Sequence, residues 1–380
     1  MRGIKFAAMG AVLALGLTAC SGDGAGSGSG DSGEAGEGSG LIGVAMPTQT
    51  SERWIADGEA VKSGLEEAGY EVDLQFGNDD IPTQQQQIDQ MITKDVDLLI
   101  IGSIDGTALT NQLQAAADAD IPVIAYDRLI RDSENVDFYV TFDNENVGVQ
   151  QATSLLVGLG ILNEDGSEGD ATGPFNIELF AGSLDDNNAT FFFNGAMKTL
   201  QPYIEDGTIV VKSGQTTIEQ AATLRWSQET AQKRMEDILT STYGGGSEQL
   251  DGILSPFDGI SRGIITALQN AGYGTTIADG LPVVTGQDAE IASIKLIADG
   301  TQFATIFKDT RKLADQAVVA ADSFLQGEEP EANDTESYDN GVKVVPSFLL
   351  ESDIVYTDNI EALLIESGYW TAEQVEKGQA

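Results

Sequence analysis

The 380-residue sequence contains no histidine and only one cysteine, Cys20. Without histidine the chain lacks the usual metal ligand and the commonest general acid or base at neutral pH. This excludes hydrolases with a histidine triad and zinc sites built on histidine. A single cysteine allows no intrachain disulfide, so the fold must be held together by packing alone. We therefore expect no metal ion and no cofactor.

Basic residues are also scarce, because 19 Lys and Arg face 61 Asp and Glu, which gives a net charge of -42. So acidic a chain is not expected to bind nucleic acid or to adhere to anionic lipid through its charge. We attribute the acidity to solubility or to a salty habitat rather than to a cationic substrate. A hydrophobic content of 41% is typical of a globular protein, and the length suffices for two domains.

The N-terminal apolar run, residues 6–17, is too short to span a membrane. Arg2 and Lys5 precede it, and small residues lead into Cys20. Residues 1–20 therefore resemble a bacterial lipoprotein signal peptide, in which Cys20 becomes the lipid-modified first residue. Residues 21–40 consist of Gly, Ser, Ala, Asp and Glu and predict a flexible linker.

This N-terminal pattern predicts a lipid-anchored protein on the outer face of the cell membrane, or in the periplasm if the organism has an outer membrane. The alternative is a buried N-terminal helix. The glycine-rich stretch after Cys20 argues against it, because such a helix would have nothing to pack on.

Short apolar runs alternate with helical patterns from residue 41 onward. Residues 96–101 are typical of a strand buried on both faces, and residues 53–69 place Trp54, Val61 and Leu65 on one helical stripe. Strands are predicted at 41–46, 72–76, 96–101, 123–126, 138–142, 177–181, 209–211, 252–254, 283–285 and 304–307. The alternation predicts an α/β fold with parallel sheets and right-handed crossovers, and the number of strands predicts two domains.

Polar residues cluster after several of these strands, at the edge where open α/β sheets bind their ligands. Four of the scarce basic residues follow predicted strands, namely Arg53, Arg128, Arg225 and Lys308. Carboxylates and amides accompany them. Such groups hydrogen-bond to sugar hydroxyls, while an aromatic ring covers the C–H face of a sugar. The pattern favours a sugar-binding cleft between the two domains.

Eight segments carry a family resemblance that covers the chain from residue 41 to its end: SERW at 51–54, AYDR at 125–128, FDNE at 142–145, DNNA at 186–189, LRW at 224–226, SPFDG at 255–259, TGQDA at 285–289 and FKDTR at 307–311. In this order and spacing they resemble the type I periplasmic solute-binding proteins of bacterial ABC sugar importers, above all xylose-binding proteins and multiple-sugar-binding receptors. The resemblance implies two Rossmann-like lobes with parallel sheets, joined by three hinge crossovers.

The lobe boundaries that the resemblance implies place residues 41–142 and 308–345 in the N-terminal lobe. Residues 143–307 and 346–380 fall in the C-terminal lobe. The resemblance also implies which residues contact the monosaccharide: Arg53, Asp127, Arg128, Asp186, Asn188, Trp226, Phe257, Asp288 and Lys308.

Phe257 departs from the pattern of the xylose-binding proteins, which carry an asparagine at this place, whereas the multiple-sugar receptors similarly place an aromatic residue there. A lost amide and a gained ring change which hydroxyls are satisfied, so xylose specificity does not carry over. We expect an aldose such as glucose, galactose, arabinose or xylose.

For several of these residues, the sequence also allows a purely structural role in place of sugar binding. Arg128 and Asp127 are neighbours and can form a plain ion pair. Trp54 begins an apolar stripe and is expected in the core, whereas Trp226 lies off such a stripe and is the better stacking candidate. Of the three rings at residues 191–193, we expect at least one in the core and another beside the cleft.

Three aspartates, Asp185, Asp258 and Asp309, are either helix N-caps or direct ligands. The acidic loop at 163–170 has a passing likeness to a calcium loop, but it lacks the bidentate glutamate at the required distance, so we expect a solvated loop.

The leading functional hypothesis is a monomeric binding protein without catalysis, which closes on its sugar and delivers it to the permease of an ABC importer. A receptor that signals to a sensor or chemotaxis partner is the alternative with the same pocket. An exported carbohydrate enzyme that uses Asp127 and Asp288 as its carboxylate pair is a third. Arg128 and Lys308 argue against it, because they would keep both carboxylates ionised.

Overall fold

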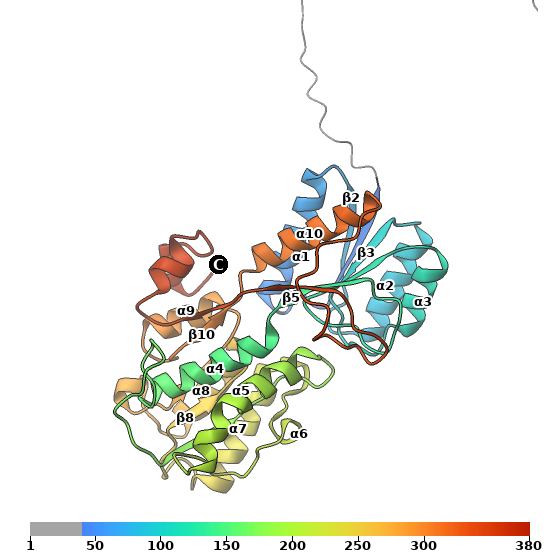
Figure 1. Cartoon of the computed structure of the whole chain (residues 1–380). Coiled ribbons are helices and arrows are strands. Elements are labelled where there is room, and N and C mark those ends of the chain that lie inside the picture. Colours follow the sequence, from blue (N-terminus) through green and yellow to red (C-terminus); the bar gives the residue numbers. More distant parts are fainter. Residues whose placement is uncertain (1–39) are drawn as a thin grey trace, which may run out of the picture. The chain divides into compact units, whose positions relative to one another are not determined.

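A parallel six-stranded sheet forms the centre of the first lobe (Figure 1). The computed structural model describes residues 40–380, so the predicted signal peptide, Cys20 and the predicted linker up to residue 39 lie outside the described residues. The strands run in the order β11-β5-β4-β3-β1-β2, and every neighbouring pair is parallel. They are β1 (Leu41–Met46), β2 (Glu71–Phe76), β3 (Leu98–Ile101), β4 (Val123–Tyr126), β5 (Phe138–Phe142) and β11 (Ser347–Leu350).

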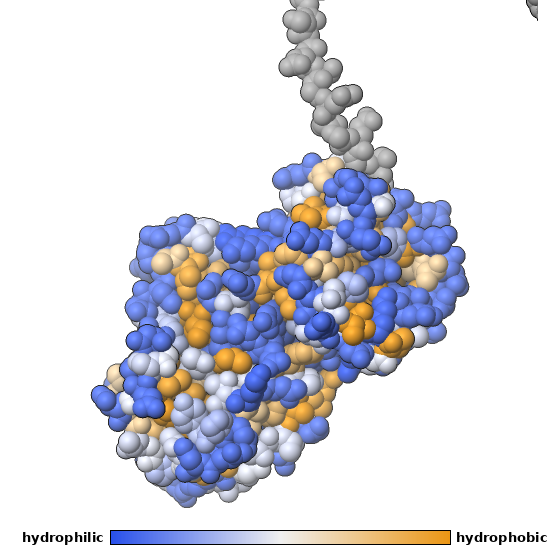
Figure 2. Space-filling view, in the orientation of Figure 1, coloured by the Kyte–Doolittle hydropathy of each residue, from blue (hydrophilic) through white to orange (hydrophobic). Residues whose placement is uncertain are grey.

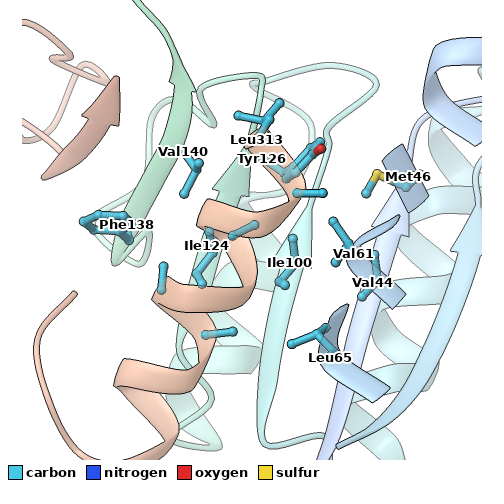
Figure 3. Close-up of a cluster of buried hydrophobic side chains, with 14 of the residues drawn as sticks. Val44, Met46, Val61, Leu65, Ile100, Ile124, Tyr126, Phe138, Val140 and Leu313 are labelled. Atoms are coloured by element: carbon cyan, nitrogen blue, oxygen red, sulfur yellow. The ribbon is translucent and has the colours of Figure 1, made fainter. Parts of the chain in front are cut away.

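Helices cover both faces of this sheet because alternate strand residues point to opposite sides. Ile100 and Ile124 pack with α1 (Glu52–Glu67) and α10 (Thr310–Leu325), and Figure 3 shows their side chains between the sheet and these helices. Leu99 and Ile101 belong to a second cluster with α2 (Ile81–Thr93) and α3 (Thr110–Asp118). The continuously apolar strands thus reflect burial on both faces.

The second lobe is built around a four-stranded parallel sheet in the order β7-β6-β8-β9. Helices α4 and α5 pack in one hydrophobic cluster with this sheet, and α7 and α8 pack in another. The strands are β6 (Phe175–Leu179), β7 (Ile209–Val211), β8 (Gly252–Leu254) and β9 (Val283–Val284); the helices are α4 (Asn144–Gly158), α5 (Asn188–Glu205), α6 (Ile218–Ala221), α7 (Gln228–Thr242) and α8 (Asp258–Asn270).

The end of the chain adds a smaller layer to the second lobe. Strand β10 (Thr305–Phe307) pairs antiparallel with β12 (Asp353–Val355), while Ile306 forms a parallel bridge with Gln287. The predicted parallel arrangement of residues 304–307 thus holds on one side of the strand and not on the other. Helix α9 (Ile291–Ala298), a π-helical turn (Glu361–Ile365) and α11 (Ala372–Lys377) pack around this pair in one hydrophobic cluster.

The predicted boundary at residue 345 needs a correction, because β11 belongs to the first sheet. Residues 347–350 pair in parallel with β5, so the chain leaves the first sheet only after Leu350. The sequence of β11 is short and its side chains are mostly half-buried, so it looks like a linker between the lobes. Only its pairing with β5 shows that it is a strand of the first sheet. The α/β fold with parallel sheets is confirmed.

Helices α4 and α5 cross at very short range through two glycines. A Cβ atom on Gly148 would lie 2.0 Å from the carbonyl oxygen of Phe192, and one on Gly195 would lie 2.0 Å from that of Glu145. Each glycine therefore lets one backbone touch the other. This contact holds the N-terminal half of α5, which begins at Asn188.

The surface in Figure 2 is covered mainly by hydrophilic residues, with hydrophobic ones in separate small groups. Among residues 40–380, no helix combines the length and the apolar character needed to cross a membrane.

Gly148→Ala tests the contact between α4 and α5. We expect a loss of about 1–3 kcal/mol of unfolding free energy, because the added methyl group meets a backbone oxygen that cannot move aside. Urea unfolding measures this loss. Asn194→Ala, on the exposed side of α5, is the control and should change the stability by less than about 0.5 kcal/mol. Equal stabilities of the two variants would contradict the contact.

Candidate functional site

A cavity of about 360 Å³ lies between the two lobes, where the carboxyl ends of both sheets meet. This volume is at the small end of the range for ligand pockets, about 300–1,000 Å³. All nine predicted site residues line it: Arg53, Asp127, Arg128, Asp186, Asn188, Trp226, Phe257, Asp288 and Lys308. The structure thus brings together groups that are up to 255 positions apart in the sequence, counted from Arg53 to Lys308.

Arg53 is the electrostatic centre of the cavity. Its guanidinium lies 2.7 Å from Asp127, 3.2 Å from Asp57 and 3.9 Å from Asp288. Burial works against the charge, but the three carboxylates outweigh it and raise the pKa of Arg53 well above its usual value. Asp288 comes from the second lobe, so this one cation links the two lobes.

Lys308 is a fully buried cation between two aromatic rings. Its ammonium lies 2.9 Å from Asp288 and 5.6 and 5.5 Å from the ring centres of Phe142 and Phe192. Burial acts to raise the pKa of Asp127, but Arg53 and Lys308 outweigh it and lower that pKa to about 2. Asp127 therefore stays ionised as a hydrogen-bond acceptor.

Arg128 and Asp186 form a second link between the lobes, at 3.1 Å. The ion pair that Arg128 makes is thus with Asp186, and the predicted alternative of a pair with its neighbour Asp127 is not the one observed. Burial raises the pKa of Asp186 despite the nearby Arg128.

Asp57 lies beneath Arg53 and was not predicted. It is one helical turn along α1, has no exposed surface, and burial raises its pKa to about 7 although Arg53 is beside it. The spacing of four residues between Arg53 and Asp57 is a signal that the sequence does contain.

Aromatic side chains form the apolar part of the cavity. Trp226 meets Phe192 and Phe257 edge to face, with ring centres 6.3 and 6.2 Å apart. Trp54 belongs to the hydrophobic core, as predicted, and also lines the cavity. Gly182 gives Trp226 its space, since a Cβ atom there would lie 2.0 Å from the indole ring.

Five residues of the cavity have left-handed backbone conformations, which residues other than glycine rarely adopt. Asp79 has φ 60°, Asp127 has φ 61°, Arg225 and Trp226 both have φ 55°, and Asp288 has φ 89°. Each such residue costs of the order of 1–3 kcal/mol. Because these conformations gather in one cavity, we infer that they are kept for the direction in which they point the side chains, despite their cost to the backbone.

Asn188 is largely occupied by the protein itself. Its amide nitrogen donates to the carbonyl oxygen of Asp127 at 2.7 Å, and its amide oxygen accepts from Tyr139 and Asn144. One amide N–H remains for a ligand. Asn188 therefore also joins α5 to the end of β4.

The three ambiguous aspartates differ in role. Asp309 caps α10 by accepting from the backbone N–H of Arg311. Asp185 pairs with Arg225 at 3.0 Å. Asp258 is neither a side-chain cap nor a cavity residue, because it is fully buried and accepts from the N–H of Glu290 and the amide of Gln302.

Several cavity residues were missed by the sequence reasoning: Thr48, Thr50, Asp79, Gln228, Arg262 and Glu290. Asp79 follows β2, so the rule that led to the other residues applies to it as well. Arg262 and Glu290 form an ion pair at 2.6 Å. Glu290 follows β9, so the same rule applies to it, whereas Arg262 lies within α8, beyond the loop that follows β8.

Among the described residues, no group of three or more Asp, Glu or Cys side chains is arranged to hold a metal ion. The 163–170 loop is held by its own hydrogen bonds, with Asp165 accepting from both the backbone and the hydroxyl of Ser167.

Comparison with known proteins identifies the family. Residues 42–329 match the periplasmic binding protein domain. The chain is a periplasmic binding protein. It is 52% identical over 336 residues to the multiple sugar-binding periplasmic receptor ChvE of Rhizobium radiobacter, a match that covers 88% of this chain and 92% of the relative. The D-xylose-binding periplasmic protein of Escherichia coli is 36% identical, over 86% of this chain and 90% of that protein.

Solved structures of binding proteins are similar as well. A solute-binding protein from Clostridium phytofermentans with bound β-D-glucose is 45% identical, with a TM-score of 0.82 over 88% of this chain and 99% of that chain. One from Chloroflexus aurantiacus in complex with D-glucose is 37% identical, with a TM-score of 0.77 over 88% and 98%. These relatives are binding proteins, so this periplasmic binding protein is not an enzyme.

Asp57→Asn tests the buried carboxyl group. Its raised pKa means that, between about pH 4, where it would titrate in the unfolded chain, and about pH 7, the folded state holds a proton that the unfolded state lacks. The contribution of Asp57 to the free energy of unfolding is therefore largest below pH 4, and it is lost as the pH rises to about 7. Asp57→Asn, which stays neutral, should gain several degrees in melting temperature relative to the wild type across this window.

Thermal unfolding without sugar, from pH 4 to 8.5, measures the difference. Asp237→Asn removes an exposed carboxylate on α7 and is the control for the loss of one negative charge. An offset for Asp57→Asn that does not vary with pH would show that Asp57 does not titrate in this range.

Proposed function

We propose that this protein binds a monosaccharide, an aldose such as glucose, galactose, arabinose or xylose, in the cavity between its lobes and delivers it to the permease of an ABC importer. The sugar would contact the nine predicted residues. The protein would work as a monomer on the outer face of the cell membrane, or in the periplasm, held by a lipid on Cys20.

The combination of buried ionic groups and aromatic rings in one cavity carries the proposal. The carboxylates of Asp127, Asp186 and Asp288 can accept hydrogen bonds from sugar hydroxyl groups. The side chains of Arg53, Arg128 and Lys308 can donate to such hydroxyls. An ion pair with a carboxylate holds each of these cations in a fixed orientation. Trp226 and Phe257 supply flat apolar surface to the same space. The two relatives with bound glucose support this choice of ligand.

Phe257 bears on which sugar is bound. Its ring replaces an amide that would hydrogen-bond to one hydroxyl, so a sugar is favoured that presents C–H surface at this position. The 52% identical relative is named a multiple sugar-binding receptor, which supports a pocket that accepts several aldoses. We therefore propose a range of aldoses rather than xylose alone.

A thermal-shift screen with single monosaccharides is the decisive experiment. A ligand present at 100 times its dissociation constant adds about 2.7 kcal/mol to the folded state, which is readily detected. A sugar that raises the melting temperature is then measured by calorimetry. If no monosaccharide stabilises the full chain, the proposed function is wrong.

Signalling is the second candidate, because the name of the 52% identical relative includes the word receptor. Uptake of a labelled sugar separates the two roles. Cells that lack this protein should lose uptake if it feeds an importer, and should keep uptake but lose the sugar response if it is a signalling receptor.

Trp226→Ala should weaken sugar binding about 10- to 100-fold, because the stacked ring buries the C–H face of the sugar. Trp226→Phe keeps a ring and should lose less. Calorimetry measures both affinities, and circular dichroism checks that each variant is folded. Wild-type affinity in the alanine variant would exclude stacking by Trp226.

Cys20→Ala should release the protein from the membrane while leaving its affinity for sugar unchanged, since residues 40–380 contain the whole cavity. Fractionation of cells followed by calorimetry on the released protein measures both properties. Membrane retention of the variant would contradict a lipid on Cys20.

A further inference from the structure

The two lobes touch at one lip of the cleft through contacts that the nine proposed sugar residues do not make. The backbone N–H of Gly106, after β3 in the first lobe, donates to the carbonyl oxygen of Asp185 in the second lobe at 3.1 Å. The guanidinium of Arg225 lies 3.0 Å from the carboxylate of Asp185 and donates to the carbonyl oxygen of Ile104 at 3.4 Å. Arg225 therefore holds both sides of this lip.

Arg225 is presented to the lip by an unfavourable backbone. Both Arg225 and Trp226 are left-handed, and the backbone N–H of Arg225 donates to the hydroxyl of Ser183 at 2.8 Å. Two consecutive residues of this kind turn the Arg225 side chain toward the first lobe and the Trp226 ring toward the cavity. Strain of this size persists only where surrounding contacts hold it.

We propose that Arg225 is a positioning residue that latches the closed lobes, so that it sets how long the sugar stays bound without contacting the sugar itself; this inference rests on the proposed function. Trp226 lies over the sugar when the lobes are closed, and Arg225, its neighbour in the same rigid turn, then reaches Ile104. Sugar stacking and lobe closure are thereby coupled through one short segment, Leu224–Trp226.

Arg225 also lines the cavity, but its surroundings differ from those of the buried cations. Its side chain is 33% exposed, against 6% for Arg53 and 2% for Lys308. Its charged partner, Asp185, is outside the cavity lining, whereas Arg53, Arg128 and Lys308 pair with carboxylates that line it. A latch at the rim adds to the free energy of closure and not to recognition of a particular hydroxyl.

Arg225→Gln is the test, with Lys212→Gln as the matched control. Lys212 is a cation of the same lobe with 31% side-chain exposure, and it pairs with Glu248 away from the cleft. In Arg225→Gln we expect sugar to dissociate about 3- to 10-fold faster, by nearly the same factor for every aldose that binds. Asp185→Asn should have a similar effect, and the double variant should add little to either. Stopped-flow fluorescence gives the dissociation rates.

Small-angle scattering of the full chain gives the second readout, with the wild type expected to be more compact than Arg225→Gln. The latch is overturned if dissociation from Arg225→Gln equals that from the wild type and from Lys212→Gln. It is also overturned if one sugar is weakened far more than the others, which would make Arg225 a direct ligand. If the wild type binds no sugar, the proposed function fails. The latch is then judged by scattering alone, and equal radii of gyration overturn it.

Discussion

The contact of one buried guanidinium with three carboxylates is the constraint on which the binding cleft depends. Arg53 meets Asp57 on its own helix, Asp127 at the end of β4, and Asp288 in the second lobe. A buried cation is tolerated only when it is paired, and loss of Asp127, the partner with the lowered pKa, would remove most of that compensation. Neither lobe holds this set alone, so the deep part of the cleft exists as a unit only when the lobes are together.

Regular structure and strained structure are separated in this molecule. The sheets and helices follow ordinary rules of alternation and burial, and their cores are apolar on both faces of each sheet. The left-handed residues that face the cavity, such as Asp127 and Asp288, lie in the loops that follow strands. The two sheets and their helices form a rigid scaffold that holds these loops in conformations that would be unfavourable on their own. The side chains on the loops are thereby kept in fixed positions.

Most of the cavity could be predicted because its residues follow strands, and a parallel sheet brings the carboxyl ends of its strands to one edge. Arg128 and Lys308 are examples. Arg262 could not be found in this way, because it lies within α8, beyond the loop that follows β8. The predicted lobe boundary at residue 345 was wrong for a related reason. The pairing of β11 with β5 defines that strand more than its amino-acid composition does. The lipid anchor lies outside the described residues and stays a prediction.

The cavity holds five of the chain's 19 basic residues, namely Arg53, Arg128, Arg225, Arg262 and Lys308. Five carboxylates line the cavity as well, namely Asp79, Asp127, Asp186, Asp288 and Glu290, so the lining is close to neutral and the net charge of -42 falls on the rest of the chain. Salt screens repulsion between exposed carboxylates, but it screens buried pairs much less. Ionic strength thus acts on the outside of the molecule and largely spares the interior. The ion pairs inside the cleft are therefore much the same in dilute and in saline surroundings.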